Sequence, residues 1–235
     1  LDIDYAVEIV TDKENPDANT NFTLQKDESK PISKIPQFCF NCDETVETIY
    51  IGKDVKEIDG KAFFTCKTLK QIIVDEENEY YCDIDGVLYN KDLTTLIKYP
   101  VAKVGATFDI PAGVTTIGFG AFANATNLTS VNIPASVQTI ETSAFMSCSA
   151  LTSITIPDSV TSIGNDAFYD CSNVIVAYNN SDLIIVAGSA NNGYVGAYAY
   201  KIVDKNGTAR YLAGHEEIDG FIFKNTDGAY VLKAY

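Results

Sequence analysis

Basic and metal-binding side chains are scarce in this chain, and each scarcity excludes a class of function. The 235 residues include one histidine, one methionine and no tryptophan, and 17 Lys and Arg stand against 32 Asp and Glu, for a formal net charge of −15. A single histidine excludes a zinc site built on a histidine pair. A surface this acidic would repel a phosphate backbone, so we expect no nucleic-acid partner.

Long apolar runs and dense cysteines are also missing. No apolar stretch approaches the roughly 18–20 residues of a membrane-spanning helix, so we expect no transmembrane segment. Six cysteines in 235 residues are too dilute for a small disulfide-stapled scaffold. The hydrophobic content of 46% suffices for a sizeable core, which excludes general disorder.

The charge is distributed unevenly along the chain. Residues 1–110 carry 22 acids and 12 bases (net −10), and residues 111–235 carry 10 acids and 5 bases (net −5). No Lys or Arg lies between Val104 and Tyr200, where Thr, Ser and Asn fill most polar positions. These residues favour β-structure over exposed helix, which is richer in Glu, Lys and Arg.

An internal repeat with a constant spacing is the strongest signal in the sequence. Its matched positions are Ile110-Pro111, Ile133-Pro134 and Ile156-Pro157; Val114, Val137 and Val160; Ile117, Ile140 and Ile163; and Ala121-Phe122, Ala144-Phe145 and Ala167-Phe168. An earlier copy runs from Ile51 to Val74, and a degraded copy precedes it from Ile32. The period of about 23 residues falls in the range of roughly 20–29 residues that leucine-rich repeats have, so the pattern predicts a solenoid. We expect roughly five turns of this solenoid, which we call coils.

Each part of the unit has a structural interpretation. The segment L-x-x-I-x-I points alternate side chains inward, as a short strand does, and the following Pro removes a backbone donor and ends the strand. The segment A-F-x-x-C predicts a short helical turn. One coil cannot bury its apolar face alone, so neighbouring coils must stack with their strands in parallel, about 4.8 Å apart.

The unit from Ile156 to Cys171, which reads IPDSVTSIGNDAFYDC, closely resembles the BspA-like leucine-rich repeats. The resemblance covers roughly residues 31–178. It implies a secreted or surface protein of anaerobic gut or oral bacteria, or of mucosal protists, associated with adhesion to host matrix or to other cells. It implies no catalytic residues.

The departures from the repeat predict the organisation of the chain. Asp85-Gly86, flanked by β-formers, predicts a β-hairpin inserted between two coils. The segment Glu217–Asn225 repeats this hairpin, so we expect the native chain to continue past Tyr235 into another repeat block, or to be cut at a domain edge. The predicted segments are an N-terminal cap (1–30), repeats (31–74), a hairpin insertion within the solenoid (75–109), repeats (110–178), and a C-terminal cap or the start of a further repeat block (179–235).

Four cysteines share one repeat position, where the remaining full copy has Ala125; they are Cys42, Cys66, Cys148 and Cys171. A position that accepts Cys or Ala is a small buried slot, so we interpret these residues as buried free thiols. Cys39 and Cys42 form a C-x-x-C spacing, but no βαβ context and no second pair support a redox or zinc site.

Other chemistry-bearing residues are isolated. Asp83 and Asp85 lack the ligand spacing of a calcium loop, which favours a solvated turn over a weak cation site. His215 lies in a polar segment and no G-x-S-x-G occurs, which favours a surface histidine over a catalytic one. We therefore expect no catalytic, cofactor-binding or metal-binding residues and no enzymatic activity.

The remaining candidates are the outward positions of the L-x-x-I-x-I strands, because repeat proteins bind partners on such faces. They are Thr48, Tyr50, Gln71, Ile73, Ser130, Asn132, Ser153 and Thr155. The first hypothesis is an extracellular or cell-surface binding or adhesion protein, a monomer whose partner is a protein such as a host matrix or cell-surface protein. The alternative is a structural spacer of a larger surface protein with no ligand of its own.

Overall fold

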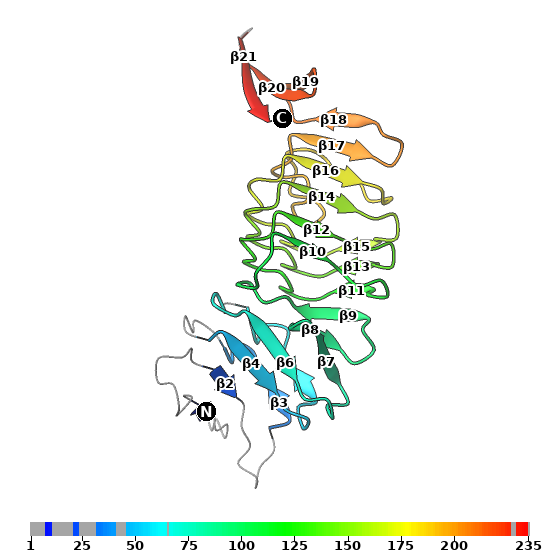
Figure 1. The fold of residues 1–235 in the computed structure, drawn as a ribbon. Helices are drawn as coiled ribbons and strands as arrows, with labels where there is room; N and C mark the ends of the chain where they lie inside the picture. Colours follow the sequence, from blue (N-terminus) through cyan, green and yellow to red (C-terminus); the bar gives the residue numbers. More distant parts are fainter. Residues whose placement is uncertain are drawn as a thin grey trace.

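The computed structural model describes residues 8–10, 21–23, 32–40, 46–64, 66–226 and 229–234, and these form a stack of coils (Figure 1). The predicted leucine-rich-repeat solenoid is confirmed, with about seven turns and a period near 23 residues. The expected number of five coils is too low, because the stack continues past residue 178, where the predicted repeats end. Two further strands follow there, and Val176 pairs with Lys201 across a coil that is two residues longer than the 23-residue period, which a fixed period misses.

One side of the solenoid carries three sheets, which contain the strands predicted from L-x-x-I-x-I together with strands that the motif did not predict. The first sheet contains β1 (Glu8–Val10), β2 (Asn21–Thr23), β4 (Thr48–Ile51) and β6 (Gln71–Val74). The second contains β10 (Thr107–Asp109) and β12 (Ser130–Asn132). The third contains β14 (Ser153–Ile156), β16 (Val176–Asn179), β17 (Lys201–Asp204) and β18 (Ala209–Tyr211).

The other strands form three further sheets. One pair contains β3 (Lys34–Ile35) and β5 (Glu57–Ile58). A six-stranded sheet contains β15 (Ser162–Ile163), β13 (Thr139–Ile140), β11 (Thr116–Ile117), β9 (Thr95–Lys98), β8 (Val87–Asn90) and β7 (Tyr81–Ile84), in that order. At the far end of the stack lies an antiparallel sheet of β19 (His215–Ile218), β20 (Phe221–Thr226) and β21 (Ala229–Ala234) (Figure 1).

Neighbouring coils align in the register that the repeat predicts. Ile49 pairs with Ile72 across β4 and β6, one repeat period further along the chain. The buried phenylalanines of the Ala-Phe pairs form a ladder: the Phe122 and Phe145 ring centroids lie 4.8 Å apart, and those of Phe145 and Phe168 lie 4.9 Å apart. These spacings match the distance between paired strands, and each stacked pair adds about 0.5–1.5 kcal/mol beyond its buried area.

The A-F-x-x-C segments are turns, and no helix occurs among the residues that the structure describes. The predicted helical turn is therefore wrong. The Phe122 amide donates to the Ala144 carbonyl of the next coil over 2.7 Å, and Phe145 donates to Ala167 in the same way. Because these donors serve the neighbouring coil, they cannot close a helix, and residues such as Asn124 adopt a positive φ of 65°.

The segment between the two repeat blocks contains an antiparallel hairpin, β7–β8, with Asp85 and Gly86 at its tip in the left-handed region. The Ile72 amide of β6 donates to the Gly86 carbonyl over 2.8 Å, which attaches the hairpin to the first block. β8 pairs with β9, and β9 pairs in parallel with β11 of the second block. The hairpin segment thus connects to both blocks through backbone hydrogen bonds.

The cysteine position behaves as a buried slot where the structure describes it. Cys66, Cys148 and Cys171 are buried, and each thiol donates to a carbonyl of the preceding coil, at 3.0 to 3.1 Å. Burial raises the pKa of the Cys171 thiol to about 12 and that of Cys148 well above its ordinary value. Cys42 lies outside the described residues.

Candidate binding surface

The candidate surface is the outward side of the parallel strands β10, β12, β14, β16 and β17, with β18 at the end. The strand period of two alternates inward and outward side chains: Ile154 and Ile156 of β14 are buried, whereas Ser153 is half-buried and Thr155 is exposed. The inward residues anchor each strand in the core, so the outward residues form a ladder of fixed spacing that a partner could contact.

The structure brings the eight predicted residues together in two groups. In the first block, Thr48 pairs with Gln71 and Tyr50 pairs with Ile73 across β4 and β6. In the second block, Ser130 and Asn132 lie on β12, and Ser153 and Thr155 lie on the next strand, β14. The hairpin segment lies between the two groups in the sequence. The first-block strands β4 and β6 share a sheet that contains neither β12 nor β14 of the second block.

Thr48 is a correction to the predicted set. Only 5% of its surface is exposed, although it occupies an outward position of the motif. β4 lies between β2 and β6, and the Gln71 side-chain amide donates to the Thr48 hydroxyl over 3.1 Å. Thr48 is thus buried between two neighbouring strands, whereas Gln71 is exposed.

Gln71 and Ile73 line a groove of about 520 Å³ beside the hairpin tip, which we call the hairpin groove. Its lining residues are Lys70, Gln71, Ile73, Asp83, Asp85, Gly86, Lys103 and Val104. The Lys103 ammonium lies 2.9 Å from an Asp85 carboxylate oxygen, and Lys70 lies 2.6 Å from Glu47. Both bases are therefore neutralised by carboxylates of this chain, which leaves the groove with no unpaired cation among its lining residues.

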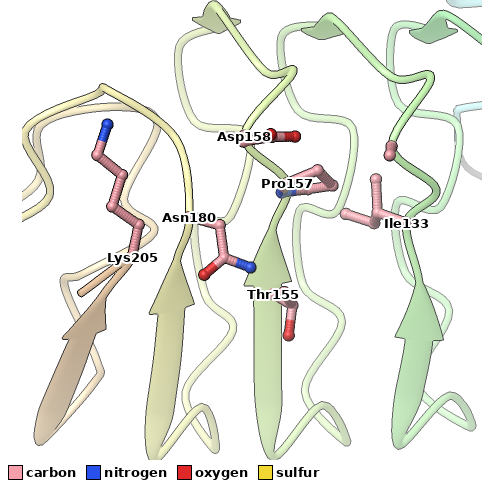
Figure 2. A pocket seen from close by; sticks show the side chains of 7 residues that line it. Ile133, Thr155, Pro157, Asp158, Asn180 and Lys205 are labelled. Carbon is pink, nitrogen blue, oxygen red and sulfur yellow. The ribbon is translucent and has the colours of Figure 1, made fainter. Parts of the chain in front are cut away.

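A second groove, of about 450 Å³, lies at the carboxyl ends of β12, β14, β16 and β17; we call it the strand-end groove (Figure 2). The groove is bordered by Thr155 of β14 and by residues that follow the ends of successive strands, which are Ile133, Pro157, Asp158, Asn180 and Lys205 (Figure 2). Lys205 forms an ion pair with Asp182, which raises the lysine pKa and lowers that of the aspartate. The groove opens onto the candidate surface through Thr155, one of the predicted residues.

The candidate surface becomes apolar and aromatic toward its C-terminal end. Tyr178, 43% exposed, pairs with Thr155 on one side and with Val203 on the other. Beyond it, Lys201 pairs with Tyr211, and its ammonium lies 5.8 Å from the centre of that ring. The strand ladder thus changes from Ser, Thr and Asn to Tyr and Val over neighbouring coils.

A carboxylate of the C-terminal sheet holds this aromatic end in place. Lys201 forms an ion pair with Glu217, and the Tyr211 hydroxyl donates to the same carboxylate over 2.7 Å. Both hydrogen bonds lower the pKa of Glu217, and the carboxylate raises the pKa of Lys201. Burial and the bond to Glu217 raise the pKa of the Tyr211 hydroxyl. The contacts with Glu217 thereby fix the Tyr211 ring and the Lys201 ammonium at the edge of the candidate surface.

The aromatic end was missed in the sequence, although part of it could have been found. Val176 and Tyr178 follow Ser153 and Thr155 by one repeat period, so extending the pattern by one copy identifies them. Lys201, Val203 and Tyr211 follow the longer, irregular coil and an antiparallel strand, so no fixed spacing identifies them.

The histidine weighed for catalysis packs against a tyrosine. The His215 ring stacks on Tyr200 with centroids 4.9 Å apart, which gives the histidine a packing role. Among the residues that the structure describes, no group of three His, Cys, Asp or Glu side chains could hold a metal ion. A search of the same residues finds no helix with the length and hydropathy to cross a membrane.

A solenoid of stacked coils with a regular period and an outward strand ladder defines a leucine-rich-repeat protein. The family described as "BspA type Leucine rich repeat region" matches residues 18–97 and 105–227 in six copies, and the chain belongs to this family. No curated protein matches the chain.

Solved structures similar to the chain are bacterial leucine-rich repeat proteins. A leucine-rich repeat protein from Eubacterium ventriosum is 31% identical, with a TM-score of 0.62, and the match covers 68% of this chain and 42% of that one. A leucine-rich cell surface protein from Faecalibacterium prausnitzii is 27% identical, with a TM-score of 0.51 and coverage of 74% and 51%. The pneumococcal vaccine antigen PcpA is 23% identical, with a TM-score of 0.56 and coverage of 68% and 45%. The chain therefore spans about half the length of these neighbours, or less.

Proposed function

We propose that this chain is a non-enzymatic, extracellular or cell-surface protein that binds a protein partner, such as a host matrix or cell-surface protein, through the outward face of β12, β14, β16 and β17. The observation that carries the proposal is the gradient on this face from Ser, Thr and Asn to the exposed Tyr178 and the half-buried Val203. Tyrosine is enriched in protein interfaces, where its ring supplies contact area at a low entropic cost.

Further features support a surface binder. The neighbours of known structure include a protein described as a cell surface protein and a vaccine antigen. The second-block residues of the predicted set, which are Ser130, Asn132, Ser153 and Thr155, belong to the proposed face. Tyr50, Gln71 and Ile73 lie outside this face, on β4 and β6 beside the hairpin groove, and form a second, separate candidate surface. The chain acts as a monomer and without a cofactor in this proposal.

The second candidate function is a structural spacer with no ligand of its own. It is favoured by the small outward side chains of β12 and β14, because a face of Ser, Thr and Asn also suits plain solvation. Saturable binding to a protein would distinguish a binding protein from a structural spacer.

The test is surface plasmon resonance of the whole chain against purified collagen, laminin, fibronectin and mucin. We expect saturable binding to at least one of them, weakened at least about tenfold by Thr155→Arg, because a large charged side chain in mid-face obstructs a partner. Gln138→Arg, at an exposed position outside the proposed face, is the matched control and should bind as the parent does. If the chain binds none of the four proteins, the spacer is favoured. If Thr155→Arg and Gln138→Arg weaken binding equally, the assignment of binding to the proposed face is contradicted.

A further inference from the structure

The chain contains the same hairpin unit twice, at β7–β8–β9 and at β19–β20–β21. Both tips have an Asp-Gly pair in the left-handed region, with φ values of 50° and 74° at Asp85 and Gly86 and of 52° and 85° at Asp219 and Gly220. Both units also have an irregularity at the same place in the middle strand, after Leu88 in the first and after Ile222 in the second. The two units are therefore structural equivalents, and the first shows what surrounds the second when it is fully packed.

The pairing register identifies which residues of the last strands correspond. Tyr89 pairs with Leu96 in the first unit, and the equivalent Phe223 pairs with Leu232 in the second. Leu96 is fully buried because the outer edge of β9 carries β11, with Leu96 paired in parallel to Ile117. Leu232 is 49% exposed at the same position. The burial of Leu96 indicates that a parallel strand paired with β21 would likewise cover Leu232.

We propose that the outer edge of β21 is a docking edge for a further solenoid coil of the same repeat type, whose short strand adds in parallel as β11 adds to β9. The sequence supports this occupant, because Leu232 and Tyr235 repeat the spacing of Leu96 and Tyr99. Tyr99 occupies the place of the ladder phenylalanines and stacks on Phe122, with centroids 5.3 Å apart. An exposed apolar edge strand is also an unusual end for a sheet, since such edges pair readily.

Two neighbouring residues of β21 make the proposal specific. Val231 is 47% exposed, nearly the same as Leu232, but its counterpart one residue before Leu96 is the half-buried Thr95. A docked coil should therefore cover Leu232 and leave Val231 at a position that tolerates a polar residue. The same substitution, to threonine, can be made at both positions.

The test compares the chain with an extended chain in which a copy of residues 100–178 follows Tyr235, as Pro100 follows Tyr99. Hydrogen exchange of the β21 amides is measured in both. We expect at least about tenfold slower exchange in the extended chain, because a docked coil protects the edge amides. Leu232→Thr should abolish this slowing, and Val231→Thr should preserve it.

Three results would overturn the proposal. Unchanged exchange in the extended chain means that the edge does not accept a coil. Equal effects of Val231→Thr and Leu232→Thr mean that the inferred register is wrong. A dimer of the original chain, lost in Leu232→Thr, means that a second copy occupies the edge. Thermal unfolding of both variants in the original chain checks that each still folds, since both side chains are half-exposed there.

Discussion

Lys98 is the residue with the least expected environment, because its side chain is fully buried with no carboxylate partner among the residues that the structure describes. The Tyr99 amide donates to the Ala121 carbonyl, as Phe122 donates to Ala144, so Lys98 stands where the repeat has Ala. Its ammonium donates to the Gly120 carbonyl over 3.0 Å. Burial lowers its pKa to about 8, although the Cys66 and Cys148 thiols act in the opposite direction.

Lys98 should make stability depend on pH. The folded-state pKa of about 8 lies below the ordinary 10.5, so between these values the unfolded chain binds the extra proton and the Lys98 contribution to stability rises with pH. Below pH 8 the buried charge costs up to about 3 kcal/mol. We expect Lys98→Met to raise the free energy of unfolding at pH 7, with a gain that shrinks as the pH approaches 10.5.

Denaturant unfolding of the parent and the variant from pH 7 to 10.5 measures this difference. The Gly120 carbonyl keeps a donor in the variant, because the Ala123 amide also bonds to it over 3.0 Å. Lys67→Met, at an exposed position, is the control and should change stability by less than about 0.5 kcal/mol. A destabilised Lys98→Met, or a gain independent of pH, would contradict the assigned environment.

The cysteine ladder is a residue-scale feature that the sequence predicted well. One position alternating between Cys and Ala indicated a small buried slot, and the structure places Cys148 and Cys171 there. The sequence could not show that each thiol donates to a carbonyl of the preceding coil, because that contact joins residues far apart in the chain. The burial of Thr48 could not be predicted either, since the Gln71 amide that donates to its hydroxyl lies on another strand.

At the scale of the element, the hairpin tip shows how a turn joins a neighbouring strand. Gly86 has a φ of 74°, and a Cβ added there would lie 2.9 Å from the Gln71 Cβ and 3.3 Å from its Cα. Gly220 at the second tip has a φ of 85°, but an added Cβ would meet nothing within 4 Å. Both glycines supply a left-handed conformation, whereas only Gly86 also permits close approach to β6.

Gly86→Ala should therefore destabilise the protein more than Gly220→Ala. We expect about 1 kcal/mol for the conformation alone and about 2 kcal/mol or more where the Gln71 backbone also obstructs the new methyl group. Thermal or denaturant unfolding of both variants measures the difference. Equal losses, or a larger loss at Gly220, would show that β6 does not pack on the hairpin tip as described.

The elements were predictable where the chain repeats and unpredictable where it does not. The period placed β12 and β14 because Pro and alternating Ile recur there at fixed spacing. It gave no information on the coil from Val176 to Lys201, whose extra length breaks the period. It also mistook turns for helical turns, because the donors of residues such as Phe145 serve the next coil rather than their own.

At the scale of the whole molecule, the solenoid converts a one-dimensional repeat into a surface. Because strands align at the spacing of the repeat, each outward position of the motif becomes a column across the coils, and the column of Asn132 and Thr155 ends in Tyr178 and Val203. The sequence predicted the face and half of its second-block residues. It could not predict Val203 and Tyr211, whose placement depends on the irregular coil and on Glu217 from the C-terminal sheet.

The central claim is that this strand face, rather than the turn side of the coils, contacts the partner. Tyr178 on the face and Tyr169 on the turn side provide a matched pair, since each is 43% exposed. The decisive measurement is the affinity of Tyr178→Ala and Tyr169→Ala for a matrix protein that the parent binds, after circular dichroism shows that both variants fold. We predict at least about tenfold weaker binding for Tyr178→Ala, as for an interface tyrosine, and parental affinity for Tyr169→Ala. Parental affinity for Tyr178→Ala with a loss for Tyr169→Ala would contradict the claim.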